Sequence, residues 1–90
     1  MEDILKQALE DAGAELQASA QAVAHLTAVR AGELSVLVGQ PGYDQAVIAA
    51  RDEIALAAGL PVVENPDQAT SRVISIVQGG LMMLAGRLAS

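Results

Sequence analysis

The side chains of this sequence that could carry out chemistry are few and scattered. His25 is the only histidine, and it follows Ala24 and precedes Leu26 in an apolar, helix-forming stretch. Histidine is the usual acid or base near neutral pH, but an imidazole at the edge of an apolar helical face is normally solvated or flanks an interface. The serines at 19, 35, 71, 75 and 90 have no histidine in a recognisable nucleophile context. We therefore predict no catalytic residue and no enzymatic activity.

Candidate metal ligands are equally sparse. A structural zinc site needs about four His or Cys ligands, and the sequence has one histidine and no cysteine. Carboxylates cluster at Glu10, Asp11 and Glu15 and again at Asp52 and Glu53, without the Glu-x-x-His motif of di-iron bundles. Solvated acidic faces explain these clusters, so we predict no metal and no cofactor.

The charge pattern argues against phosphate and nucleic-acid binding. There are 11 acidic and 5 basic residues, a net charge of -6, and the basic residues are spread along the chain without aromatic stacking partners. The glycine-rich segment 38–42 lacks the Lys-Ser or Lys-Thr pair that would follow a phosphate loop. Its Pro-Gly pair is typical of a turn. We expect no nucleic-acid partner.

The composition indicates small-residue helices with a surplus of apolar surface. Hydrophobic residues make up 52% of the 90 positions, with no Phe, no Trp and one tyrosine, Tyr43. A chain of this length forms one modest core, which leaves apolar surface to be covered by copies of the chain or by a partner.

The first predicted helix covers 2–38. Apolar residues recur there at alternating steps of four and three, as in a heptad seam, and acidic Glu2 and Asp3 suit a helix start. The seam passes through Leu5, Leu9, Ala12, Leu16, Ser19, Val23 and Leu26 and ends at Arg30. Gly32 is an alternative stop, and a short strand over 34–38 is an alternative to helix there.

The second predicted helix covers 44–58, with Asp44 as its N-cap. Gly59, Leu60 and Pro61 form a typical C-terminal stop, because glycine adopts the left-handed conformation and proline cannot extend a helix. An extended link at Val62 and Val63 should follow.

The third predicted helix covers 66–88 and has a strong start signal. Asn65 is a candidate cap, followed by proline, an acid and glutamine at the first three helical positions. Three glycines, Gly79, Gly80 and Gly86, lie within it, which suggests a tight helix crossing or a bend. The uncharged stretch 73–86 is too short for a hydrocarbon core of roughly 30 Å at about 1.5 Å per residue.

These elements predict an all-α fold, a helical hairpin or three-helix bundle with a long N-terminal helix, oligomeric or partner-bound. Residues 1–90 should form a single helical domain. The acidic N-terminus is unlike a secretory signal, so we expect the chain to remain in the cytoplasm or within an assembled particle. An interfacial helix normally has a sharply charged face, which 66–88 lacks, so we expect no membrane contact.

For function, we expect a structural or assembly subunit that self-associates through apolar, Ala- and Gly-rich helix faces. By composition alone the chain resembles subunits of virion and secretion assemblies, without a motif that names a family. The alternative is an acidic adaptor or inhibitor that binds a helix or basic surface of another protein. The residues expected to make the contacts, within the core or between subunits, are Leu16, Val23, Leu26, Ile74, Val77, Gly80, Leu81, Leu84 and Leu88.

Overall fold

The computed structural model describes residues 2–60 and 64–90 as a bundle of helices. The elements are α1 Glu2–Asp11, α2 Ala20–Leu34, the short 3-10 helix η1 Ser35–Leu37, α3 Tyr43–Ala57 and α4 Gln68–Ala89. The described residues contain no strand, which confirms the all-α prediction. Pro61 of the predicted stop signal and the extended link at Val62 and Val63 lie outside the described residues.

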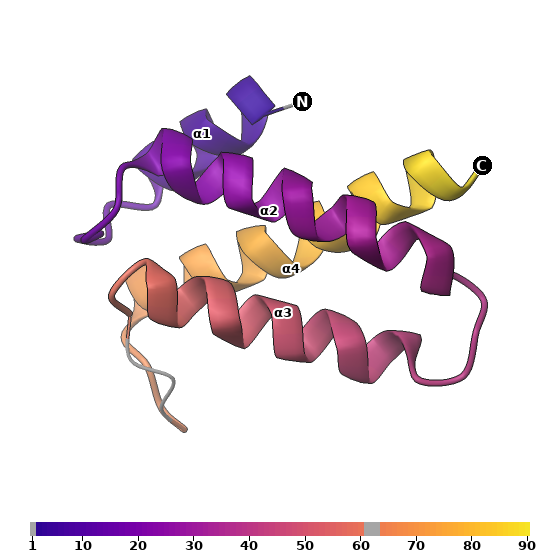
Figure 1. Ribbon diagram of the computed structural model, residues 1–90. Helices are drawn as coiled ribbons and strands as arrows, with labels where there is room; N and C mark the ends of the chain where they lie inside the picture. The colour runs from indigo at the N-terminus through magenta and orange to yellow at the C-terminus, as the bar shows by residue number, and fades with distance from the viewer. Residues whose placement is uncertain (1, 61–63) are drawn as a thin grey trace.

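Helix α4 is the centre of the bundle. It packs against α1, α2 and α3, and η1 also contacts it; Figure 1 shows it running behind α2 and α3. The largest fully buried side chains come from all four helices, and they are Leu9, Thr27, Val47, Ile54, Val73, Val77 and Leu81. Thr27 satisfies its buried hydroxyl by donating a hydrogen bond of 2.8 Å to the carbonyl oxygen of Val23.

The predicted long helix over 2–38 is wrong, because the chain breaks between α1 and α2. Gly13 has a φ of 76°, in the left-handed region that ends helices. The Ser19 hydroxyl then accepts a 3.1 Å hydrogen bond from the Ala22 N–H and caps α2. Ser19, which interrupts the heptad seam, is therefore a helix start. The break lets α1 fold back against α2, as Figure 1 shows.

The end of α3 is confirmed, and it holds the α1–α2 connection in place. The Leu60 N–H bonds the Ala55 carbonyl at 2.9 Å and the Gly59 N–H bonds the Leu56 carbonyl at 3.0 Å, which is the Schellman pattern. Gly59 has a φ of 83°, and the Gln17 side chain lies where a Cβ of residue 59 would be. Gln17 also donates its backbone N–H to the Ala58 carbonyl at 2.8 Å.

The boundaries of α3 and α4 differ from the predictions by one or two residues. Helix α3 begins after Gly42, whose φ is 91°, so Asp44 lies in the first turn and is not the cap. Helix α4 is capped by Asp67 instead of Asn65, because the Asp67 carboxylate accepts a 2.7 Å hydrogen bond from the Thr70 N–H. Helix α2 continues past Gly32, and residues 35–37 are 3-10 helix, so the alternative strand over 34–38 is wrong.

Gly80 allows α4 to cross α1 and α2 closely. A Cβ at this position would lie 2.7 Å from Leu5 Cδ2 and 3.4 Å from Thr27 Cγ2. The first distance is shorter than real Cβ atoms show, so a side chain larger than hydrogen would displace Leu5 from its site. Gly80 is therefore the α4 glycine at which an added side chain would meet the core.

We predict that Gly80→Leu destabilises the fold by about 1–3 kcal/mol, because it overpacks the crossing. Gly32→Leu is the matched control, since Gly32 lies in α2 with nothing within 4 Å of its Cβ position. Gly42→Ala should fall between them, because its positive φ of 91° strains alanine without any clash. Urea unfolding of dilute protein measures all three. Equal losses for Gly80→Leu and Gly32→Leu would contradict the close crossing.

The Asp67 cap should make stability depend on pH. Hydrogen bonds from the Thr70 side chain and then from its backbone N–H lower the pKa of Asp67 below the usual value of 3.8. A carboxylate with a lowered folded pKa stabilises the fold above its unfolded pKa, and this contribution is lost as the pH falls through the folded pKa.

We therefore expect Asp67→Asn, which preserves a capping side chain, to be less sensitive to acid than the wild type. Urea midpoints of the two chains should converge or cross as the pH is lowered from about 6 to about 3. A constant difference across this range would show that the Asp67 carboxylate does not contribute through its charge.

Candidate interaction surface

The structure divides the predicted contact residues between the core of the chain and its surface. The fully buried ones are Val23, Val77, Gly80 and Leu81. Those partly buried against this core are Leu16, Leu26, Ile74 and Leu84, and Leu88 is 61% exposed. Most of the predicted set therefore packs within the chain itself.

An apolar groove lies between α1 and α4. Its volume is about 370 Å³, and it is lined by Ile4 and Leu5 of α1 and by Ile76, Gly79, Gly80 and Met83 of α4. Ser75 adds a hydroxyl at its edge. We call this surface the α1/α4 groove. Leu5 and Gly80 are buried and form its floor, whereas Ile4 is 67% exposed and Met83 is 54% exposed.

The periodicity of α4 builds one wall of the groove. Residues three, four and seven apart share a helix face, so Ser75, Gly79 and Met83 point the same way, and Arg72 and Gly86 extend this face along the helix. A Cβ at Gly79 or at Gly86 would meet no atom within 4 Å. The helix backbone is therefore accessible from outside along this face.

The predicted contact residues did not include Ile4, Gly79 or Met83, although Gly79 was one of the three glycines that suggested a tight crossing or a bend. Ile4 lies beside the apolar seam and not on it, and Met83 lies within the uncharged stretch 73–86 without a periodic signal of its own. The pair Gly79-Gly80 is the sequence feature that could have indicated this surface, because neighbouring helical residues point about 100° apart. One glycine of such a pair can face the core while the other faces outward.

A second exposed apolar surface lies at the C-terminal end of α2, on and next to η1. Val36 is 78% exposed, and Leu37 and Val38 are also exposed. We call these three residues the η1 ridge. The other exposed large hydrophobic side chains are Val29, Ile48, Leu56, Met82 and Leu88.

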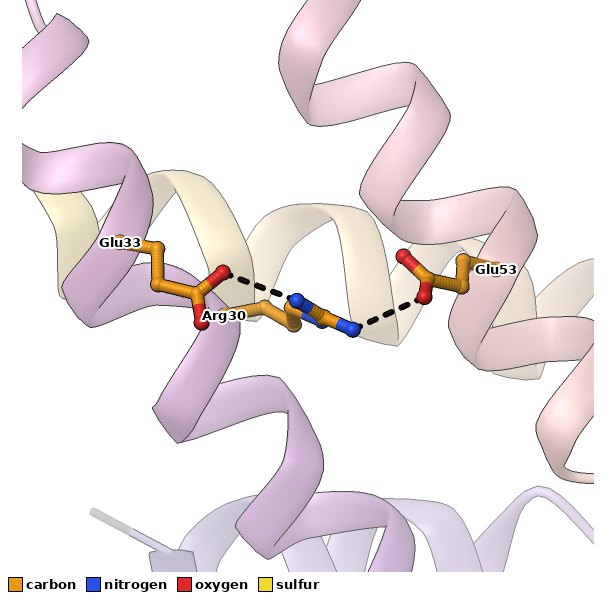
Figure 2. Close-up of polar contacts among 3 residues, drawn as sticks. All are labelled: Arg30, Glu33 and Glu53. Carbon is orange, nitrogen blue, oxygen red and sulfur yellow. Dashed lines mark hydrogen bonds and ion pairs between the residues drawn. The ribbon is translucent and has the colours of Figure 1, made fainter.

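The strongest polar cluster joins α2 to α3. The Arg30 guanidinium donates to Glu33 at 2.9 Å and to Glu53 at 2.8 Å, as Figure 2 shows. The hydrogen bond to Glu33 and then the negative charge of Glu53 raise the pKa of Arg30. Its Nε is buried without a hydrogen-bond partner among the described residues. Each terminal nitrogen of the guanidinium bonds a carboxylate, and Glu53 belongs to α3, so this cluster links α2 to α3.

The other basic side chains divide into paired and unpaired groups. Arg51 donates to Gln78 at 2.8 Å, and the exposed His25 lies 3.2 Å from a Glu2 carboxylate oxygen. Arg72 and Arg87 are exposed, and neither forms an ion pair within residues 2–60 and 64–90. These two arginines mark the two ends of the exposed face of α4.

Helix α4 also has the length and composition of a membrane-crossing helix. Among the described helices, α4 is the one with this property. Of its most apolar window, 28% is buried inside the bundle. Core helices of bundles meet the same criteria. Within the bundle, the face of α4 that carries Val73, Val77 and Leu81 is buried in the core.

Comparison with known proteins gives no relative from which a function could be transferred. No family model, no curated protein and no solved structure matches this chain. Any functional conclusion therefore depends on the physical properties of the surface.

The exposed glycines of α4 should behave differently from Gly80. Because Gly79 and Gly86 have open space at the Cβ position, we predict that Gly79→Ala and Gly86→Ala each stabilise the dilute chain by roughly 0.5–1 kcal/mol through helix propensity. Urea unfolding at low protein concentration measures this. A loss of stability for either variant would mean that its backbone is already covered within the chain.

Proposed function

We propose that this protein is a non-enzymatic assembly subunit that self-associates through the α1/α4 groove. The carrying observation is the groove itself, an apolar hollow whose rim residues Ile4 and Met83 are more than half exposed. Covering apolar surface contributes about 25 cal/mol per Å². The groove therefore supplies a driving force for association.

The size of the chain supports this proposal. A stable interface covers about 800 Å² per partner, which is a modest part of the 5245 Å² surface of this chain. The η1 ridge adds three exposed apolar side chains to the surface. A subunit with more than one apolar contact is able to hold more than one neighbour, as an extended assembly requires.

The alternative function is an acidic adaptor that accepts an amphipathic helix of another protein in the same groove. The net charge of -6 favours a basic partner. One measurement separates the two functions, because a self-associating subunit changes its mass with concentration and an adaptor remains a monomer until its partner is added.

The test is light scattering after size-exclusion chromatography over a wide range of protein concentration, with a matched pair of variants. Ile4→Glu places a charge on the rim of the groove. Leu56→Glu makes the same change on α3, where the residue is 63% exposed against 67% for Ile4. We expect Ile4→Glu to weaken self-association at least about tenfold and Leu56→Glu to leave it unchanged.

Two results would contradict the proposal. A wild-type chain that remains monomeric at high concentration would remove self-association altogether. A wild-type oligomer that Ile4→Glu and Leu56→Glu weaken equally would show that the groove is not its interface. Circular dichroism spectra of both variants establish that each is folded before its mass is interpreted.

A further inference from the structure

We infer that the occupant of the α1/α4 groove is the same groove of a second copy, with the two α4 helices crossing at Gly79 about a twofold axis. This inference rests on the proposed function and adds the identity of the occupant and the point of contact. Three observations support it, and they concern the backbone, the charges and the dimensions of the surface.

The backbone of α4 is accessible at Gly79 in a way that the internal packing does not explain. Glycine in a helix interior costs about 1 kcal/mol relative to alanine. Gly80 is explained by its close contact with Leu5, whereas a Cβ at Gly79 would meet nothing within 4 Å. A second helix crossing at Gly79 would come close to this bare backbone, as small residues allow at helix crossings.

The charges around the groove have both signs. On the α4 side, Arg72 and Arg87 lie at the two ends of the exposed face and form no ion pair with described residues. The α1 side is acidic, with four carboxylates and one lysine in its sequence EDILKQALED. Asp3 and Asp11 are exposed on it.

A surface with both signs suits a copy of itself better than a partner of one sign. In a twofold interface the same patch meets itself, so it must be self-complementary. An inclined crossing of two α4 helices lays an arginine-bearing end of each over the acidic α1 of the other copy. A basic helix would instead face Arg72 and Arg87, and an acidic one would face α1.

The dimensions also fit. From Arg72 to Arg87 the face extends about 22 Å at 1.5 Å per residue, within the 33 Å longest dimension of the molecule. Gly79 lies near the middle of this face, so two α4 helices that cross there have about two helical turns of exposed surface on either side of the contact.

Cysteine cross-linking tests the crossing point directly, because the chain has no cysteine. Disulfides need Cα atoms within about 7 Å, so Gly79→Cys on the twofold axis should link two copies under mild oxidation. Leu56→Cys is the control, at a position of α3 that is 63% exposed. We expect Gly79→Cys to cross-link at least about tenfold faster, in proportion to the proximity that the dimer imposes.

A second pair of variants tests the energetic role of the bare backbone. Gly79→Leu should raise the dimer dissociation constant at least about tenfold, because the side chain holds the two helices apart. Gly32→Leu makes the same change at an exposed helical glycine of α2, which also has nothing within 4 Å of its Cβ position. It should leave the dissociation constant within about twofold of the wild-type value. Melting curves at low concentration confirm that both chains are folded.

The outcomes separate this inference from the proposed function. A wild-type chain that is monomeric at every concentration overturns both. A wild-type oligomer with slow Gly79→Cys cross-linking, or one that Gly79→Leu does not weaken, overturns the crossing and leaves self-association standing. Association that needs a different protein overturns the second copy as occupant.

Discussion

The contact of Gly80 with Leu5 and Thr27 is the constraint on which the rest of the structure depends. At Gly80, where α4 has no side chain, Leu5 of α1 and Thr27 of α2 approach α4 together. Leu5 then fills the space, and the floor of the α1/α4 groove is formed by the same contact. The buried packing and the exposed surface are therefore two sides of a single helix crossing.

The all-helical class and the core face of α4 could be predicted from the sequence. Val77, Gly80 and Leu81 were among the predicted contact residues, and all three are buried. The end of α3 was also predictable, because glycine and the following leucine are a local signal that needs no tertiary partner. Helical periodicity and local capping motifs are therefore sufficient to predict these features of the folded chain.

The break between α1 and α2 could not be read from the same signals. Gly13 and Ser19 each fit a continuous alanine-rich helix at modest cost, and the heptad seam runs past Gly13 and through Ser19. Tertiary contacts determine that the chain forms two helices here, since only a broken helix can place Leu5 and Leu9 against α4 as well as α2. The candidate surface was missed for a related reason. Which of two adjacent glycines faces outward depends on the neighbours that pack against the helix.

The tie between Gln17 and the end of α3 has a consequence for the N-terminal helix. A helix of ten residues does not hold its shape alone in water, so α1 needs both the apolar floor beneath it and an anchored connection. Gln17 supplies that anchor by bonding the Ala58 carbonyl and resting on Gly59. Loosening α1 would therefore erase one wall of the groove, and any partner held there would stabilise the native chain by mass action. Folding of the N-terminal turn and occupancy of the groove are thereby thermodynamically linked.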